Sequence, residues 1–483
     1  MKKIIYTIAL LVILCSTLVS CKKFLEKQPI GKIGKETLFE TVDGAKMATL
    51  GSYNLMLTYY KNNFGMYGDA ASDNLISGSR ASAMLQQYNF QSTSTDDAFA
   101  VGTIWLNIYE TINSANNILV AIPTLKTKFP EQTKTLDSIY GQALVIRAIG
   151  HFDLTRVYAQ PYNFTGDASH LGIPVLTKTP APGELIARKT VKETYTQIIQ
   201  DLTDAIPFLQ QYANHNTQTG ITYQAALALL SRVYLYKGDW AQCISYSDRV
   251  INDAAYKLVD GNSYKAFFNT YFSNNVGSKT EGIFQLTNNG FNVSASSMFS
   301  IYSDATSAQY SSSVKVRTLF DSDDIRLTTM FYTPTAGDNA GKPLTRKYGD
   351  GSVTTLTPQL VQVIRLSEIY LNRAEAKWNL QQYAQAAEDI RIISQRAHPS
   401  RTITINYVSN DDLYKQIANE RNRELCFEGH RFFDLARRKE NLQRGTDCNA
   451  TTCSLNYPNN KFVLPIPSKE VEANKAMIQN PGY

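Results

Sequence analysis

Residues 67–74 carry side chains of the kinds that bind sugars. Tyrosine rings stack on the apolar faces of sugars, while aspartate and asparagine form hydrogen bonds with the hydroxyl groups. A second polar region with many aromatic residues spans residues 260–357, and we expect it to lie opposite the first. Residue type and loop position together predict one ligand site, made of Tyr67, Asp69, Asp73, Asn74, Tyr88, Tyr302, Tyr310 and Tyr348.

Sequence motifs for catalysis are missing or incomplete. The chain has neither a Gly-x-Ser-x-Gly nucleophile elbow nor a His-Glu-x-x-His zinc helix. Residues 337–343 imitate a phosphate-binding loop, but they are one residue short and have proline where a magnesium-binding Ser or Thr is needed. We therefore predict a turn there, no cofactor and no enzymatic activity. A surface glycoside hydrolase stays open as an alternative, because its paired carboxylates need not be close in sequence.

Two further patterns bear on metal binding. Residues 321–324 read Asp-Ser-Asp-Asp, but they lack the glycine and the distal glutamate of a calcium loop. The five histidines are scattered, and no two of them have the spacing of metal ligands. We therefore expect a solvated acidic turn and no metal site, and the sequence leaves calcium binding open.

Residues 420–438 form the most densely charged segment. On a helix Glu420, Glu424 and Glu428 fall on one stripe, and they would repel one another unless arginines neutralise them. One interpretation is the acid/base site of an enzyme. We favour a buried or half-buried ion network that holds the last helices against the core, because structural networks also gather such residues.

Length and composition limit the class of protein. With 483 residues, 43% of them hydrophobic, the chain can form a large core, as two domains or as one elongated domain built from repeats. The net charge of +6 is not concentrated in any run of five or six Lys and Arg, which argues against nucleic-acid binding. The 29 tyrosines supply rings that pack on one face and hydrogen-bond at the tip.

The first 20 residues have the pattern of an export signal, because Lys2 and Lys3 precede an apolar run that is too short to span a bilayer. Residues 18–21, Leu-Val-Ser-Cys, resemble a bacterial lipobox, in which the cysteine is acylated and becomes the first residue of the mature chain. We therefore predict a lipoprotein signal peptide at residues 1–20. The mature chain, residues 21–483, is then anchored to the membrane by acyl chains such as palmitate on Cys21.

Four further cysteines fall into two pairs of different character. Cys243 and Cys426 lie in segments with a helical pattern, and we expect them in the core. Cys448 and Cys453 share a polar loop, where a local disulfide fits an oxidising compartment. A zinc site does not fit, because no second Cys or His pair accompanies them.

Helical periodicity predicts the elements that position these residues. Thr190 and Glu193 form a capping box at the start of an amphipathic helix over residues 190–210. Further helical patterns cover residues 104–122, 136–158, 223–236, 240–251, 366–374 and 383–390. Short turns join them in pairs, and small residues beside a large aromatic allow close approach of the paired helices, as in tetratricopeptide-like repeats.

These patterns predict an all-α fold of tetratricopeptide-like helical hairpins, in a single domain, with long irregular excursions. Residues 260–357 are expected to be mostly loop, with short strands possible at 282–286 and 344–348. Residues 59–103 have the same character. Long irregular segments inside a helical protein are usually functional surface.

Motifs at both ends and near residue 430 resemble those of the SusD/RagB family of outer-membrane nutrient-binding lipoproteins, typical of Bacteroidetes. The matching segments are residues 21–29 (CKKFLEKQP), 427–435 (FEGHRFFDL), 464–467 (LPIP) and 479–483 (QNPGY), with Glu420-Arg421 and Glu424-Leu425 just before the second. The likeness covers nearly the whole mature chain except residues 260–357. Cys426 departs from the family, which more often has Ala or an aromatic residue there.

The resemblance implies a tetratricopeptide-like framework and a shallow binding face. It implies that the protein binds a glycan at the cell exterior and delivers it to a SusC-like TonB-dependent transporter in the outer membrane. Some relatives carry peptides instead, so a peptide ligand is a second alternative. The matching motifs belong to the scaffold, so the resemblance carries over fold and role but names no ligand.

Overall fold

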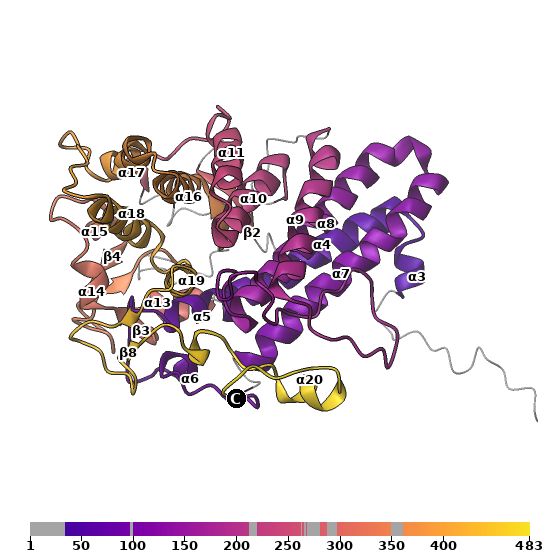
Figure 1. Ribbon diagram of the computed structural model, residues 1–483, viewed down its shortest axis with the longest axis horizontal. Helices are drawn as coiled ribbons and strands as arrows, with labels where there is room; N and C mark the ends of the chain where they lie inside the picture. The colour runs from indigo at the N-terminus through magenta and orange to yellow at the C-terminus, as the bar shows by residue number, and fades with distance from the viewer. Residues whose placement is uncertain are drawn as a thin grey trace, which may run out of the picture.

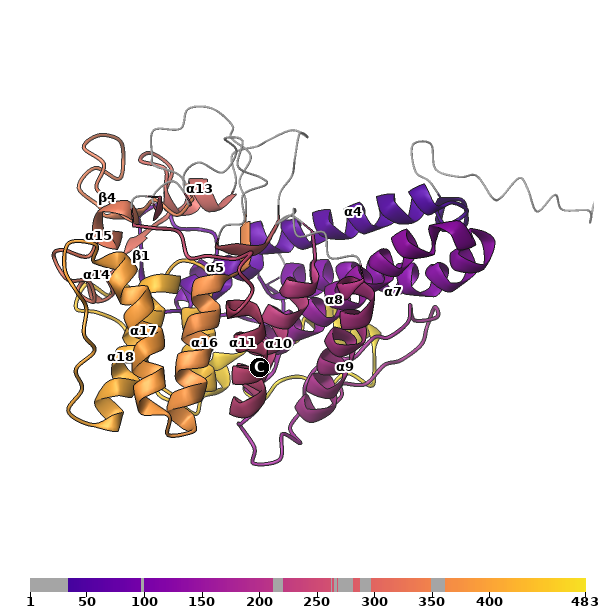
Figure 2. The same ribbon diagram turned by 90° about the horizontal axis from the view of Figure 1, so that it is seen from above.

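The computed structural model describes residues 34–96, 100–211, 220–261, 263, 264, 267, 281–286, 297–348 and 361–483. Long helices dominate the structure and follow one another in a continuous row, in which each contacts the next (Figures 1 and 2). They are α4 (Val42–Tyr59), α7 (Val101–Lys128), α8 (Thr133–Tyr158), α9 (Val191–Gln210), α10 (Tyr223–Lys237), α11 (Trp240–Ile251), α16 (Leu366–Asn379), α17 (Tyr383–Ala397) and α18 (Asn410–Leu425).

Local sequence signals set the ends of these helices. At the start of α9 the Thr190 hydroxyl accepts from the Glu193 N–H at 3.1 Å, and the Glu193 carboxylate accepts from the Thr190 N–H at 2.9 Å. This is the predicted capping box, which satisfies two N–H groups that a helix start leaves unpaired. Between α10 and α11, Gly238 adopts a φ of +76° and Asp239 caps the second helix. The predicted hairpin is therefore confirmed, with glycine in the left-handed conformation that ends a helix.

Small side chains allow α10, α11 and α16 to pack closely. The hydroxyls of Ser231 and Ser247 lie 2.8 Å apart, and the Asn372 side chain donates to Ser231 at 3.2 Å. Cys243 is fully buried beside them, as expected for a small core residue. The helix pairs thus stack in the manner predicted for tetratricopeptide-like repeats.

Short strands and helices fill the irregular parts of the chain. The antiparallel strand pairs are β1 (Leu75–Ser77) with β3 (Tyr310–Ser312), β2 (Gly282–Leu286) with β6 (Val361–Arg365), β4 (Phe331–Tyr332) with β5 (Leu344–Thr345), and β7 (Leu442–Gln443) with β8 (Ser454–Leu455). The short helical elements are α3 (Lys35–Leu38), η1 (Tyr60–Phe64), α5 (Gly65–Ala70), α6 (Leu85–Tyr88), η2 (Pro130–Gln132), α13 (Ser297–Tyr302), α14 (Val314–Arg317), α15 (Arg326–Thr329), α19 (Arg431–Arg437), η3 (Asn460–Phe462) and α20 (Ser468–Ala473).

The structure corrects the expectation for residues 59–103. We expected mostly loop, but α4 continues through η1, a π-helical turn, into α5 before the chain becomes irregular. The strand at 282–286 has the predicted bounds, whereas the one expected at 344–348 is only two residues long. Residues 337–343 form a turn, as predicted.

The predictions of a buried Cys426 and of a disulfide between Cys448 and Cys453 concern described residues, and both are confirmed. Cys448 and Cys453 form a disulfide, and Cys426 is buried like Cys243. Residues 1–20 and Cys21 lie outside the described residues, so the signal peptide and the lipid anchor stay predictions. Within the described part of the chain, no helix combines the length and apolar composition needed to cross a membrane.

Candidate ligand-binding site

The two regions that carry the predicted site residues meet in space. Strand β1, directly after Asn74, pairs with β3, which begins at Tyr310. The ring centre of Tyr310 lies 5.8 Å from that of Tyr88 and 6.3 Å from that of Tyr302. Tyr348 follows at 5.8 Å from Tyr302. The structure therefore brings tyrosines of both regions together, and Tyr88, Tyr302, Tyr310 and Tyr348 are called the tyrosine cluster below.

A close backbone contact holds α5 beside the segment that precedes α19. A β-carbon added at Gly68 would lie 2.3 Å from the carbonyl oxygen of Gly429. Gly429 itself has a φ of +75°, which favours glycine, and its own added β-carbon would lie 3.1 Å from the backbone of Gly65. The glycines on both sides therefore bring Tyr67 and Asp69 against residues 429–431.

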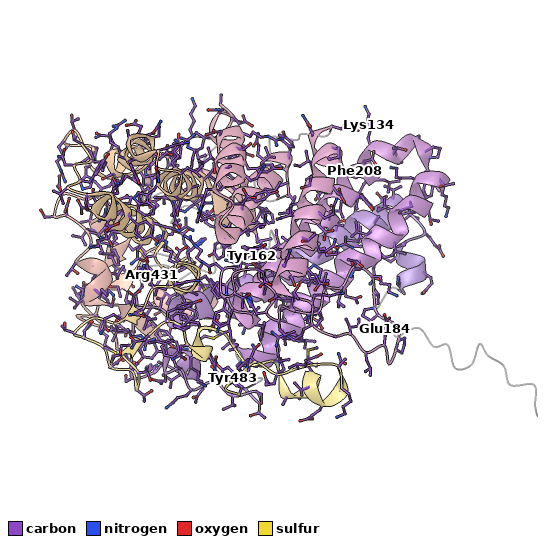
Figure 3. All side chains as sticks on the ribbon, viewed as in Figure 1. Lys134, Tyr162, Glu184, Phe208, Arg431 and Tyr483 are labelled. Atoms are coloured by element: carbon purple, nitrogen blue, oxygen red, sulfur yellow. A yellow bond between two sulfur atoms is a disulfide. The ribbon has the colours of Figure 1, made fainter. Side chains whose placement is uncertain are left out.

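Asp73 is buried and forms ion pairs with two cations, Arg431 and Lys315. The Arg431 guanidinium donates to both carboxylate oxygens, at 2.8 and 2.9 Å, and the Lys315 ammonium lies 2.8 Å from one of them. Burial alone would raise the pKa of Asp73, but the two cations outweigh it and hold that pKa well below its usual range. Arg431 is labelled in Figure 3, in the part of the molecule where Figure 1 labels α14 and α19.

Asp69 and Asn74 also bond to the C-terminal part of the chain. The amides of Asn74 and Asn422 form two reciprocal hydrogen bonds, at 2.8 and 3.1 Å. Asp69 Oδ1 accepts from the Gly429 N–H at 3.0 Å, while Oδ2 has no hydrogen-bond partner among the described residues. Burial raises the pKa of Asp69 to about 8, although the Gly429 N–H and Lys347 act in the opposite direction. This carboxyl is therefore largely protonated at neutral pH.

Three tyrosines of the cluster use their hydroxyls within the protein. Tyr88 donates to Asn449 at 2.7 Å, Tyr310 donates to the Ala83 carbonyl at 2.6 Å, and Tyr348 donates to the Phe427 carbonyl. The Arg444 guanidinium lies 4.1 Å from the ring centre of Tyr88. A cation over the ring face covers the surface on which a sugar would stack.

Most of the predicted site residues are buried in the structure. Tyr348 is partly exposed, whereas the side chains of the other seven are buried: Tyr67, Asp69, Asp73, Asn74, Tyr88, Tyr302 and Tyr310. A buried ring offers no face to a ligand in solvent. These seven residues form the floor of the region in this structure, and their direct contact with a ligand stays a prediction.

Exposed charged side chains lie in the segments that adjoin β1 and β3. Arg80 follows β1 and pairs with Asp338 of the 333–342 loop, with 59% and 48% of their side chains exposed. Gln309, directly before β3, holds the loop after β1, because its side-chain oxygen accepts from the N–H groups of Ser82 and Ala83, each at 2.9 Å. Arg80 and Asp338, called the rim pair below, are thus a solvent-accessible ion pair between the loop after β1 and residues 333–342.

The sequence did not indicate which side chains contact the predicted site residues. Predicted site residues are contacted from distant parts of the chain by Arg431, Lys315, Arg444, Asn422 and Asn449. Arg431 was visible as part of the charged segment, but its partner Asp73 lies 358 positions away. No local pattern signals the rim pair, because its two members belong to separate polar turns.

The charged segment at 420–438 forms a buried ion network, as we predicted. Glu424 accepts from Arg365 and Arg396, each at 2.5 Å, and from Arg326 at 3.0 Å. The cations of the network are Arg326, Lys347, Arg365, Arg396 and Arg423, and its carboxylates are Glu281, Asp324, Glu420, Glu424 and Glu428. Five cations against five carboxylates give a formal charge of zero, which allows such a cluster to be buried.

Comparisons with known proteins agree with this fold. A SusD-like family model described as "Starch-binding associating with outer membrane" matches residues 23–235, and the model of the SusD family matches residues 332–483. SusD-like protein P2 of Formosa agariphila is 27% identical over all of both chains.

Solved structures match over most of the chain. A putative sugar-binding protein from Bacteroides vulgatus matches with a TM-score of 0.81 and 28% identity, over 92% of this chain and 99% of the other. A laminarin-binding SusD-like protein matches in fold with a TM-score of 0.69 and 22% identity, over 91% of this chain and 99% of the other. Because the two family models together span both ends of the mature chain and the fold agrees, this chain belongs to the SusD/RagB family.

Proposed function

We propose that this protein captures a glycan at the cell surface and delivers it to a SusC-like TonB-dependent transporter. The observation that carries the proposal is the meeting of two distant irregular regions at β1 and β3, whose adjoining segments carry the tyrosine cluster and the solvent-exposed rim pair. Polar groups beside aromatic residues suit a hydroxyl-rich ligand that must be released again. Membership of a carbohydrate-binding family supports the same ligand class.

The chemistry of the rim pair and the descriptions of the relatives support this ligand class. Arg80 and Asp338 offer donors and acceptors that can bond sugar hydroxyls. One structural neighbour is described as laminarin-binding, and one family model is described as starch-binding. Glucans are therefore the first ligands to test.

We propose that the protein acts without catalysis. Hydrolysis of a glycosidic bond needs two carboxyl groups that reach the sugar, one of them protonated. Asp69 has a raised pKa, but its side chain is fully buried. The surface-hydrolase alternative predicts release of reducing sugar from a glycan that the protein binds, whereas a binding protein leaves the glycan intact.

We also propose that lipid on Cys21 holds the mature chain in the outer membrane, facing outward. Acyl chains on the first residue, followed by a short segment before the described fold, would let the folded part lie over a transporter. Metabolic labelling with palmitate tests the anchor, because a Cys21→Ser variant should lose the label while the wild type keeps it.

Removing the rim pair should weaken glycan binding without harming the fold. Because both side chains are about half exposed, the double variant Arg80→Ala/Asp338→Ala should keep the melting temperature of the wild type. Hydrogen bonds to charged groups contribute about 1.5–3 kcal/mol each, so affinity should fall at least about tenfold. Calorimetric titration of laminarin, starch and a peptide digest measures the change.

The matched control is the double variant Arg391→Ala/Glu388→Ala, which removes an exposed ion pair on α17, away from the rim. This control should bind as the wild type does. Equal binding by the rim variant and the wild type would refute the placement of the site. Binding of peptides but no glycan would favour the peptide alternative.

A further inference from the structure

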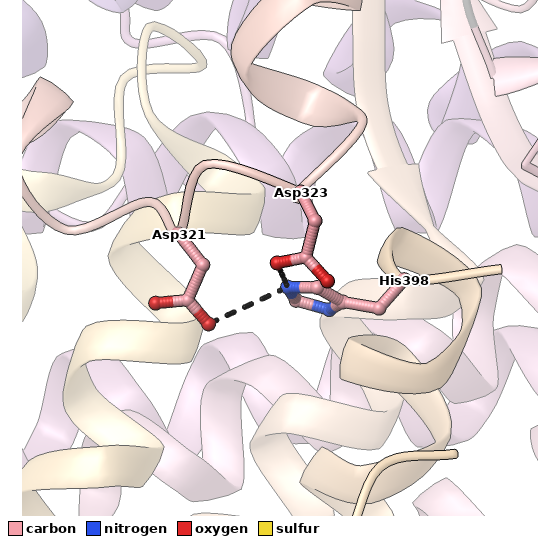
Figure 4. A group of neighbouring side chains, drawn as sticks. All are labelled: Asp321, Asp323 and His398. Carbon is pink, nitrogen blue, oxygen red and sulfur yellow. Dashed lines mark ion pairs between the residues drawn. The ribbon is translucent and has the colours of Figure 1, made fainter. Parts of the chain in front are cut away.

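Two acidic side chains and a buried histidine converge where the irregular excursion meets the helical row (Figure 4). Asp321 and Asp323 lie on the turn before α15, and His398 directly follows α17. The Ile325 N–H donates to the Ala397 carbonyl at 3.0 Å and so fixes the two segments against each other. The acidic turn expected from the sequence therefore has a histidine partner more than 70 positions away.

The histidine presents a free nitrogen to the carboxylates. Its side chain is only 4% exposed, and Nδ1 lies 2.8 Å from the Ser394 carbonyl oxygen. A carbonyl oxygen only accepts, so Nδ1 carries the proton in this hydrogen bond. The other nitrogen, Nε2, makes no hydrogen bond, and it lies 3.6 Å from Asp321 Oδ2 and 3.8 Å from Asp323 Oδ1.

This arrangement can hold a metal cation between its members. In the neutral imidazole Nε2 holds a lone pair, and here it faces two carboxylate oxygens that also hold lone pairs. Imidazole nitrogen with carboxylate oxygen is a ligand set of zinc and neighbouring transition metals. Ligands of tetrahedral zinc lie about 3.4 Å apart, as follows from metal–ligand distances of about 2.0–2.1 Å. The observed separations therefore need only small side-chain shifts.

We propose that Asp321, Asp323 and His398 form a binding site for a divalent transition-metal cation of the zinc type. Water would complete the coordination, because the two aspartates are partly exposed. The metal would join the turn at 321–324 to the end of α17. It would thereby hold the irregular segment that contains residues 321–324 against the row of long helices. This role does not depend on any glycan site.

Arg401 neutralises the carboxylates in the metal-free chain. Its guanidinium bonds Asp323 Oδ2 at 2.5 Å and Asp321 Oδ2 at 2.9 Å. Since the Arg401 side chain is 47% exposed, it can turn into solvent when a metal ion binds. Arg401 thus competes with the metal for the two carboxylates. Replacement of Arg401 should therefore strengthen metal binding, whereas replacement of His398 should weaken it.

Zinc titration of the untagged mature chain by calorimetry tests the site. A variant His398→Gln should bind zinc at least tenfold more weakly than the wild type, whereas Arg401→Gln should bind it more tightly. The variant Asp321→Asn/Asp323→Asn serves if His398→Gln fails to fold. It should also bind zinc at least tenfold more weakly than the wild type. Glu388→Gln, which changes an exposed carboxylate on α17, should bind zinc as the wild type does.

Cobalt provides a second measurement, because a visible absorption band of bound Co²⁺ should appear in the wild type and disappear in the histidine variant. Absence of zinc binding in both the wild type and Arg401→Gln would overturn the proposal, and would leave Arg401 as the permanent counter-ion. Unchanged binding in the aspartate double variant would overturn it as well.

Discussion

Glu424→Gln is expected to destabilise the protein by about 3–5 kcal/mol, the cost of removing one partner from a buried ion pair. Glu424 is fully buried and contacts three guanidiniums, those of Arg326, Arg365 and Arg396. The neutral glutamine keeps the shape of the side chain but leaves the network with five cations and four carboxylates. Denaturant unfolding at pH 7 measures the loss.

The pH dependence of the stability loss in Glu424→Gln tests whether the missing negative charge causes that loss. Burial would raise the pKa of Glu424, but Arg396, Arg365 and Arg326 hold it well below its usual range, and Arg326 and Arg423 likewise lower the pKa of Glu420 to about 2. A lowered pKa in the folded state adds stability above the unfolded pKa, and this stability is lost as the pH falls toward the folded pKa. The difference between wild type and Glu424→Gln should therefore shrink below about pH 4.

The control for this prediction is Glu388→Gln, which breaks the exposed pair with Arg391 and should change stability by less than about 1 kcal/mol. A loss of under about 1 kcal/mol for Glu424→Gln would show that the network contributes little to the fold.

Asp69→Asn is expected to stabilise the protein at alkaline pH and to leave it unchanged in acid. Burial raises the pKa of Asp69 to about 8, from the ordinary value of 3.8, so the folded state binds a proton that the unfolded state releases. The stability linked to that proton is complete below about pH 4 and is lost as the pH rises through 8. One pKa unit corresponds to about 1.4 kcal/mol, so the loss is on the order of several kcal/mol.

Asparagine is a suitable replacement because it removes the ionisation and retains the contact. Its side-chain oxygen can still accept from the Gly429 N–H, the hydrogen bond that Asp69 Oδ1 makes at 3.0 Å. Unfolding free energies of both proteins between pH 5 and 9 should diverge as the pH rises and run parallel above about pH 9. A constant difference across this range would mean that Asp69 does not titrate within it.

Helix boundaries were predictable from sequence because their signals are local. Thr190 and Glu193 lie within one turn of each other, and Gly238 ends α10 through its own conformation. Such signals do not depend on the rest of the fold. The helical turn η1 and the short helix α5 escaped prediction, since contacts with distant segments, such as that of Gly68 with Gly429, stabilise them more than propensity does.

The candidate site was predictable in composition but not in exposure. Residue types placed the tyrosines and acids of two regions together, and the pairing of β1 with β3 agrees with that. Their burial depends on what covers them, and the covering groups Arg431, Arg444 and Asn449 come from the last fifth of the chain. His398 escaped for the same reason, because its acidic partners precede it by more than 70 positions.

Co-purification from native outer membranes tests the proposed role in uptake most directly. With a tag appended after Tyr483 and gentle solubilisation, we expect a large TonB-dependent barrel in stoichiometric amount with the mature lipoprotein. Added glycan should remain with this complex. Absence of any barrel under several detergents, from membranes in which the tagged protein is abundant, would contradict delivery to a transporter.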